Sequence, residues 1–178
     1  INLNVGHSVR TIKECVEESQ KDITVATGLM ESRLLTGDPM LYENLEGAVS
    51  ADKLWPSDEF FSAKRKEQIN RHRKFAGSEY NLEPNVKGSP GGLRDIQMIG
   101  WFAKRHFGVP KLENLRDSGF IHDEELALLT EGQNFLWRVR YALHMISKRA
   151  EERLVFDRQR EIADMFGYQD SDANLAVE

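Results

Sequence analysis

The stretch Tyr80–Phe107 reads YNLEPNVKGSPGGLRDIQMIGWFAKRHF and passes abruptly from turn-forming residues to a helical pattern. Asparagine, proline, glycine and serine dominate the part before Leu93, which is typical of a loop. From Leu93 onward apolar residues recur at helical spacing, directly after the pair Gly91-Gly92. The sequence therefore predicts a polar loop that leads straight into a helix ending near Phe107.

The residues around the glycine pair suit a phosphate group. Glycines permit backbone angles that other residues avoid and allow a ligand to approach closely. A helix start offers unpaired N–H groups and a partial positive charge, and Lys87 and Arg94 on either side of the pair add two full charges. The same residues also fit the more common case of a loop that binds nothing. They complete neither a Walker A motif nor a G-x-G-x-x-G fingerprint.

The composition describes an ordinary globular domain. The chain has 178 residues, of which 40% are hydrophobic and 30% charged, and its formal net charge is −5. This acidic balance argues against general nucleic-acid binding, which favours basic domains. Cys15 is the only cysteine, so no internal disulfide can form. Since no apolar run approaches the roughly 18 residues of a membrane span and no signal peptide is visible, we expect a cytoplasmic protein with no membrane contact.

Helical periodicity extends over most of the chain. The predicted fold is mainly α, a multi-helix domain with one short N-terminal β-strand at Ile1–Val5, where apolar residues alternate. Long helices are expected near Pro56–Phe75, Leu93–Phe107 and Asp123–Arg149. Shorter helices are expected from Thr11, from Asp22 through Leu34, from Asp38-Pro39 through Leu45, at Leu112–Leu115, and from Asp157 to Gly167.

Capping signals define several of these expected ends. Thr11 and Glu14 have the spacing of a capping box. Asp22 and Asp157 are expected to act as N-caps, because an aspartate side chain can accept from the first free N–H groups of a helix. Gly167 is expected to end the last helix.

A basic run lies in the helix predicted at Pro56–Phe75. It contains Lys64, Arg65, Lys66, Arg71, Arg73 and Lys74 against the single acidic residue Glu67. Such a run fits a solvated helix face and fits a ligand-binding surface equally well.

The helix predicted at Asp123–Arg149 carries two stripes. Its apolar seam consists of Leu129, Gly132, Leu136, Val139, Leu143 and Ile146, at alternating spacings of three and four. Beside the seam, Gln133, Trp137, Arg140 and His144 form a second stripe. That second stripe either lines a cleft or forms a partly buried polar edge.

Four motifs in the chain resemble one known family. They are GHSVRT at Gly6–Thr11, NVKGSPGGLRDI at Asn85–Ile96, FLWRVRYALH at Phe135–His144 and LVFDRQ at Leu154–Gln159. Together, and in this order, they resemble the bacterial PII uridylyltransferase/uridylyl-removing enzymes. The resemblance implies transfer of UMP from UTP to the nitrogen-regulatory PII protein, and its removal in response to glutamine.

The resemblance also implies a domain organisation. In this family a nucleotidyltransferase domain related to DNA polymerase β precedes a helical domain. Residues 1–48 would be the tail of the first, including the strand at Ile1–Val5, and residues 49–178 would belong to the second. Neither end of the chain looks complete, so an interior piece of a larger enzyme is expected. The regulatory domains assigned to glutamine sensing have no counterpart here.

The resemblance further implies the roles of individual residues. The Mg²⁺ ligands of the family, an Asp-x-Asp pair and a third carboxylate, are not in this sequence, and the five histidines show no metal-ligand spacing. We therefore expect no catalytic or metal-binding residue here, and no activity from this chain alone. Candidates for nucleotide or phosphate binding are Lys87, Gly91, Gly92, Arg94 and Arg140, and secondary cleft candidates are His7, Arg10 and His144.

Two other interpretations remain open. One is a piece of the related glutamine synthetase adenylyltransferases, which carry a looser Lys-x-Gly-x-Gly-Gly-x-Arg version of the central motif. The Glu83-Pro84-Asn85 lead-in, the residues Phe135 to His144 and the pair Phe156-Asp157 fit that family less well. The other is a helical interaction module without nucleotide contact, whose basic helix docks an acidic partner.

Overall fold

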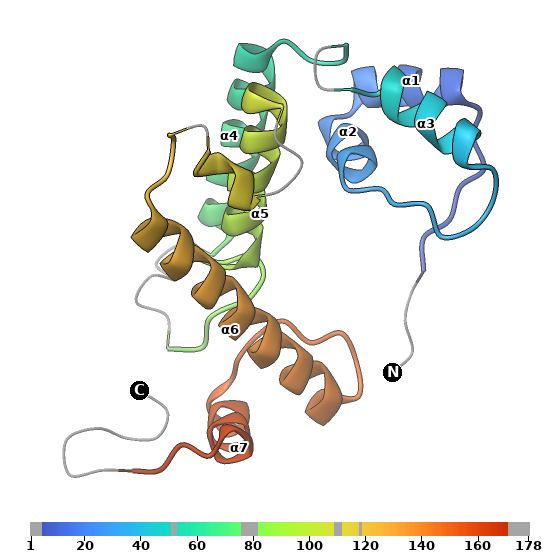
Figure 1. Ribbon diagram of the computed structural model, residues 1–178. Coiled ribbons are helices and arrows are strands. Elements are labelled where there is room, and N and C mark those ends of the chain that lie inside the picture. The colour runs from blue at the N-terminus through green and yellow to red at the C-terminus, as the bar shows by residue number, and fades with distance from the viewer. Residues whose placement is uncertain (1–4, 51–52, 76–81, 109–111, 118, 171–178) are drawn as a thin grey trace. The chain divides into compact units, whose positions relative to one another are not determined.

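The computed structural model describes residues 5–50, 53–75, 82–108, 112–117 and 119–170. In chain order its helices are α1 (Ile12–Lys21), α2 (Ile23–Met30), α3 (Pro39–Ala48), α4 (Ser57–Lys74), α5 (Leu93–Phe102), the π-helix η2 (Ala103–Phe107), the 3₁₀-helix η3 (Leu112–Leu115), α6 (Asp123–Ser147) and α7 (Phe156–Phe166) (Figure 1). The prediction of a mainly helical fold is confirmed, and the three long helices lie where they were expected.

No β-strand occurs among the described residues, which contain one isolated bridge between Asn85 and Arg153. The strand predicted at Ile1–Val5 falls almost wholly outside the described residues, and Val5 itself has no regular secondary structure. The strand therefore stays a prediction.

The capping box at α1 forms as predicted. The N–H of Glu14 donates to Thr11 Oγ1 at 3.3 Å, and the N–H of Thr11 donates to Glu14 Oε2 at 2.7 Å. Asp22 caps α2 by accepting from the N–H of Thr24 at 2.7 Å. These are local signals, and they define helix starts in the structure as they do in the sequence.

Three predicted helix boundaries were wrong. The helix expected from Asp38-Pro39 through Leu45 extends to Ala48. The helix from Asp22 was expected to reach Leu34 but ends at Met30, because both the N–H and the hydroxyl of Ser32 donate to the carbonyl of Leu29 and close the last turn. Asp157 was expected to cap α7 but lies inside its first turn, after the N-cap residue Val155. Gly167 does end α7, with a φ of 79°.

The chain divides into two compact units. The N-terminal unit comprises the described residues of Gly6–Ile69 and Gln97–Leu126. The loop unit comprises the described residues of Asn70–Ile96 and Ala127–Glu178, with Val5. Residues on both sides of the predicted domain boundary at 48/49 belong to the N-terminal unit, where the indole N–H of Trp55 donates to the carbonyl of Ser19 at 2.8 Å. The boundary at 48/49 was taken from the domain organisation of the resembled family and not from packing. It stays a prediction.

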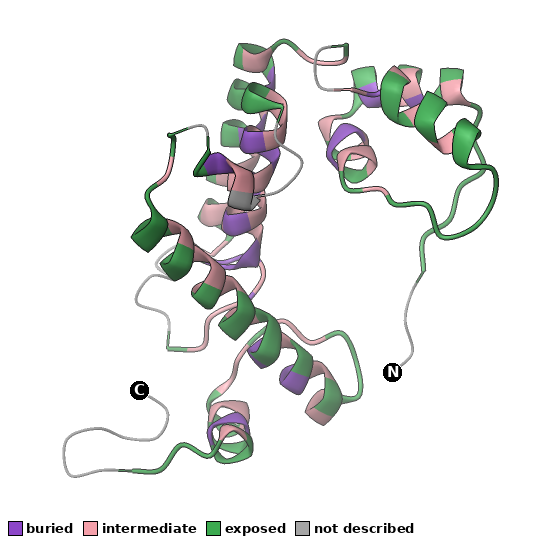
Figure 2. Ribbon diagram, viewed as in Figure 1, coloured by how far each residue is buried: buried purple, intermediate pink, exposed green. Residues whose placement is uncertain are grey.

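The N-terminal unit is built around aromatic side chains. Phe60 from α4 and Met98 and Trp101 from α5 are buried together. Figure 2 shows buried stretches, in purple, along both helices. The partly buried side chains packed against them are Ile23, Met30, Trp55 and Phe102. Lys64 is also buried here, with its Nζ 4.1 Å from the centroid of the Trp101 ring and 2.6 Å from Glu67 Oε2.

The loop unit has a separate apolar core. It contains Val86 from the loop, Val139, Ala142 and Leu143 from α6, and Ile162 from α7. The predicted apolar seam of α6 is thus buried in its C-terminal half, where Leu143 is 0% exposed. Because Val86 is part of this core, the loop that precedes α5 is anchored to α6 and α7.

Candidate functional site

The loop before α5 is held by its own side chains. The N–H of Asn85 donates to Ser89 Oγ at 2.9 Å, and the N–H of Ser89 donates to the carbonyl of Asn85 at 3.0 Å. The Asn85 side chain accepts from the N–H groups of Lys87 and Gly88 at 3.2 and 2.7 Å. This is the turn chemistry in which asparagine replaces backbone partners. The loop is therefore a folded element rather than a simple connection.

The glycine pair is required by this turn. Gly91 has a φ of +75°, in the left-handed region that favours glycine. A Cβ on Gly92 would lie 2.9 Å from the carbonyl oxygen of Ser89 and 3.0 Å from those of Lys87 and Val86. Both glycines therefore have a role in the fold of the loop, whatever it binds.

The sequence suggested that the first N–H groups of α5 would be unpaired. In the structure they all have acceptors. The N–H of Leu93 donates to the carbonyl of Val86 at 3.1 Å, that of Arg94 to Lys87 at 2.9 Å, and that of Asp95 to Gly92 at 2.9 Å. The loop curls back over the helix start and supplies these acceptors itself. An anion at this point would therefore have to be held by side chains.

The same curl brings Lys87 and Arg94 together. The hydrogen bond from the Arg94 N–H to the Lys87 carbonyl joins two residues that are seven positions apart in sequence. Both residues are partly exposed. The two cationic side chains predicted to meet a phosphate thus start from adjacent backbone positions.

The carboxylate of Asp95 connects the loop to α4. Sequence reasoning did not single this residue out. Its carboxylate accepts from the N–H of Gly91 at 2.9 Å, from Arg71 Nη2 at 2.5 Å, and lies 3.0 Å from His72 Nε2. The Arg71 and Asp95 side chains are 15% and 17% exposed. An aspartate in the first turn of a helix is a recognisable signal. Its partners on α4 are distant in sequence, and no local pattern points to them.

Arg140 is engaged by a second acidic partner, Glu152. Arg140 Nε and Nη2 donate to the two carboxylate oxygens at 2.8 and 2.7 Å, and each side chain is 20% exposed. Burial alone would raise the pKa of Glu152, but the hydrogen bonds and charge of Arg140, helped by His144 and Lys87, hold that pKa below its ordinary value. The pKa of Arg140 is raised, chiefly by the hydrogen bond to Glu152.

The second stripe of α6 is thus a partly buried polar edge at Arg140 and His144. His144 Nε2 lies 3.6 Å from Glu152 Oε1, and the Arg140 guanidinium lies 5.2 Å from the centroid of the Trp137 ring. Arg140 as a phosphate ligand remains a hypothesis that would require it to share or leave Glu152.

The other candidates are placed as follows. His7 and Arg10 are exposed and belong to the N-terminal unit, whereas Lys87, Arg94, Arg140 and His144 belong to the loop unit. The basic run of α4 is not a single surface. Lys64 is buried and Arg71 is bound to Asp95, while Arg65, Lys66, Arg73 and Lys74 are exposed.

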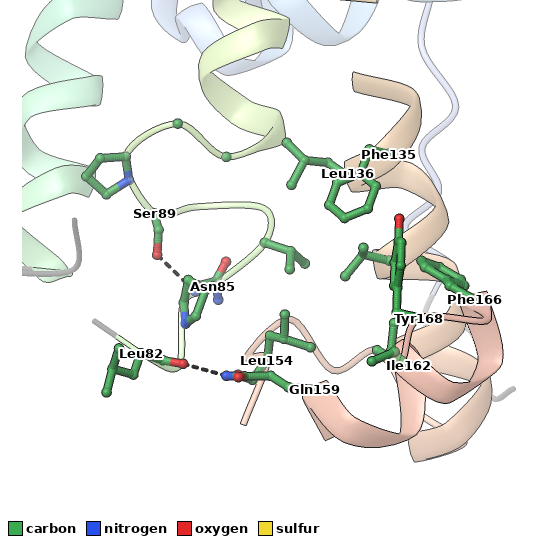
Figure 3. Close-up of a pocket in the computed structure, with 17 residues that line it drawn as sticks. Leu82, Asn85, Ser89, Phe135, Leu136, Leu154, Gln159, Ile162, Phe166 and Tyr168 are labelled. Carbon is green, nitrogen blue, oxygen red and sulfur yellow. Dashed lines mark hydrogen bonds between the residues drawn. The ribbon is translucent and has the colours of Figure 1, made fainter. Parts of the chain in front are cut away.

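The loop also forms one wall of a cavity of about 570 Å³ in the loop unit. Figure 3 shows Phe135 and Leu136 of α6 on one side of the cavity, with Ile162 and Phe166 of α7 beside them. The loop side includes Ser89 and the glycine pair. The lining is mostly apolar and includes neither Lys87 nor Arg94, so this cavity and the cationic pair are separate features of one loop.

Comparison with known proteins is decisive for the family. The model of the family described as GlnD PII-uridylyltransferase matches residues 59–178. The chain belongs to this family. The resemblance drawn from the four sequence motifs is thereby confirmed.

Full-length similarity to named enzymes of this kind supports the assignment. The bifunctional uridylyltransferase/uridylyl-removing enzyme of Azotobacter vinelandii strain DJ is 56% identical over 178 residues, which is 100% of this chain and 20% of the relative. The enzymes of the same name from Stutzerimonas stutzeri strain A1501 and Pseudomonas aeruginosa strain LESB58 are 55% and 54% identical over the same shares. The chain thus spans 20% of the length of these relatives. No solved structure matches it.

The residues that the structure describes contain no group of three or more histidine, cysteine, aspartate or glutamate side chains that could hold a metal ion. No helix within the same residues is long and apolar enough to cross a membrane.

Proposed function

We propose that this chain is a helical segment of a bifunctional enzyme that transfers UMP from UTP to the PII protein and removes it in response to glutamine. The observation that carries the proposal is the identity of 53–56% over the whole chain to enzymes named for uridylyl transfer and removal. Within such an enzyme, this segment helps to bind the nucleotide, the PII protein, or both.

The nucleotide role is assigned to the loop before α5. Lys87 and Arg94 start from adjacent backbone positions, which favours contact of both side chains with one polyphosphate. An arginine can hold phosphate oxygens through two donors, whereas a lysine acts as a point charge. Because the helix N–H groups are already bonded, the attraction comes from these two side chains. His7, Arg10 and His144 remain secondary candidates for the cleft.

Mg²⁺ is the metal implied by nucleotidyl transfer, where it neutralises developing charge on the phosphates. Among the described residues, no group of three or more histidine, cysteine, aspartate or glutamate side chains could hold a metal ion, so these residues do not fit a Mg²⁺ site. We propose that other parts of the enzyme supply the metal ligands. On this proposal the isolated 178-residue chain transfers no UMP, and measurable turnover by it would show that the active site is misplaced.

The test compares Lys87→Ala and Arg94→Ala in the full-length enzyme with PII and UTP as substrates. Loss of one charge-assisted contact costs roughly 1.5–3 kcal/mol, which is a fall in kcat/KM for UTP of about ten- to a hundredfold. Lys13→Ala and Arg116→Ala are matched controls, since the side chains they remove are 85% and 57% exposed.

Thermal unfolding separates a lost contact from lost folding. The two loop variants should keep a Tm close to that of the unmodified enzyme while losing UTP-dependent transfer. If either variant modifies PII at the unmodified rate at low UTP concentration, the phosphate role of that residue is wrong. If the unmodified full-length enzyme modifies no PII at all, the proposed function itself is wrong.

A further inference from the structure

We infer that Asp95 is a positioning residue that fixes the loop before α5 and so places Lys87 and Arg94 for the nucleotide phosphates. The inference rests on the proposed function for its second half. Its first half concerns the conformation of the loop and can be measured without any nucleotide.

Asp95 resembles a capping side chain, because its carboxylate accepts from a backbone N–H next to the helix start. The residue before α5 is Gly92, which has no side chain to accept from a helix N–H. Asp95 reaches back from within the first turn, and its Oδ2 accepts from the N–H of Gly91 at 2.9 Å. This bond holds Gly91, whose φ, at +75°, is in the left-handed region.

The Asp95 carboxylate is itself held from α4. Arg71 Nη2 lies 2.5 Å from Oδ1, and His72 Nε2 lies 3.0 Å from Oδ2, both from the last turn of α4. Because the Arg71 and Asp95 side chains are only 15% and 17% exposed, water screens this ion pair much less than it screens a surface pair. The loop is therefore tied to α4 through one carboxylate.

The position of this carboxylate links it to both phosphate candidates. Arg94 is its neighbour in the chain, and the Arg94 N–H is bonded to the Lys87 carbonyl at 2.9 Å. If Gly91 and Gly92 leave their present turn, the carbonyls that meet the start of α5 move with them. The backbone positions of Lys87 and Arg94 then no longer lie next to each other.

Asp95→Asn in the full-length enzyme is the direct test, because it keeps the size of the side chain and removes its charge. Asp117→Asn is the matched control, since Asp117 is 61% exposed and pairs only with a neighbouring surface arginine among the contacts seen here. Two quantities are measured: hydrogen exchange of peptides covering residues 85–93, without nucleotide, and KM and kcat for UTP.

Asp95→Asn should speed exchange in residues 85–93 and raise KM for UTP about tenfold, with a smaller change in kcat. The double variant Lys87→Ala/Asp95→Asn should be less impaired than the product of the two single effects, because a displaced loop has already lost the Lys87 contact. If the fold-changes of the two single variants multiply in the double variant, Asp95 and Lys87 act independently. That result would overturn the inference.

Unchanged exchange in Asp95→Asn would also overturn the inference, and would leave the proposed function standing if Lys87→Ala still raises KM. Faster exchange combined with no effect of Lys87→Ala would instead overturn the nucleotide role of the loop. If Asp95→Asn fails to fold, Arg71→Gln removes the ion pair while Asp95 can still accept from Gly91. It should then show the same faster exchange and the same rise in KM.

Discussion

The guanidinium of Arg140 donates through two nitrogens to the carboxylate of Glu152, at 2.8 and 2.7 Å. The backbone carbonyl of Glu152 in turn accepts from the N–H of Val86 at 2.9 Å, and the N–H of Leu154 donates to the carbonyl of Pro84 at 2.8 Å. The ion pair between Arg140 of α6 and Glu152, which follows α6, therefore secures the strip of backbone against which the loop before α5 is docked. The loop is thus held near its beginning by the backbone carbonyl of Glu152 and by the Glu83 carboxylate, which accepts from Arg153 Nη2 at 2.9 Å, and at its end by the Asp95 carboxylate.

Glu152→Gln should destabilise the protein by about 1–3 kcal/mol, because it leaves Arg140 partly buried with a neutral partner. The estimate lies below that for a fully buried pair, since both side chains are 20% exposed. Urea unfolding measures the change. Glu161→Gln is the matched control, because it breaks a pair in which Glu161 is 48% exposed and should change stability by less than about 0.5 kcal/mol. Equal losses in the two variants would contradict the prediction.

Stability should depend on pH through the same carboxylate. Folding lowers the pKa of Glu152 below its ordinary value of 4.5. Its contribution to the free energy of unfolding is therefore fully present above pH 4.5. That contribution is lost as the pH falls through the lower, folded value, because protonation then removes the partner of Arg140. The gap in unfolding free energy between the unmodified protein and Glu152→Gln should thus be widest near neutrality and shrink below pH 4.5. A gap that stays constant across that range would assign the effect to something other than the charge of Glu152.

Local signals in the sequence were enough to predict most of the helices. Thr11 with Glu14 and Asp22 define helix starts through bonds that span two or three residues. The end of α2 was missed because Ser32 bonds back to Leu29 and ends the turn before the apolar pattern runs out. Periodicity measures which face is apolar, and it does not report such competing hydrogen bonds.

The candidate site was only partly predictable for the same reason. Lys87, the glycine pair and Arg94 were visible because they lie together in one short stretch. Asp95 and Glu152 were missed because their partners, Arg71 and Arg140, are 24 and 12 positions away in sequence. The prediction of unpaired N–H groups at the start of α5 was wrong. Val86 and Lys87 supply acceptors for them, and this is visible only in the folded loop.

Gly92→Ala should cost more stability than Gly91→Ala. At Gly92 a Cβ would meet three backbone oxygens at 2.9–3.0 Å, and backbone cannot turn aside as a side chain can. The expected loss is about 3 kcal/mol, because the loop must shift and give up hydrogen bonds. At Gly91 there is open space, so only the strain of a φ of +75° remains, about 1–2 kcal/mol.

Gly132→Ala provides the opposite control for the glycine variants. Gly132 lies in the interior of α6 with open space around its Cβ position, so alanine should stabilise the helix by about 0.5–1 kcal/mol. Thermal unfolding of the three variants should give the order Gly132→Ala, Gly91→Ala, Gly92→Ala from most to least stable. A Gly92→Ala variant as stable as Gly91→Ala would mean that the turn is not as closely packed as described.

Lys64 should matter for its volume more than for its charge. It is 1% exposed, with its ammonium over the Trp101 ring and 2.6 Å from Glu67 Oε2. Lys64→Met keeps most of the side chain and removes the cost of burying a charge, so its stability should lie within about 1 kcal/mol of the unmodified protein. Lys64→Ala should lose about 2–4 kcal/mol, because it leaves a cavity beside Phe60 and Trp101. Lys66→Ala, at an exposed position of the same helix, should change stability by less than about 0.5 kcal/mol. If urea unfolding shows Lys64→Met to be as damaging as Lys64→Ala, the ammonium itself stabilises this core.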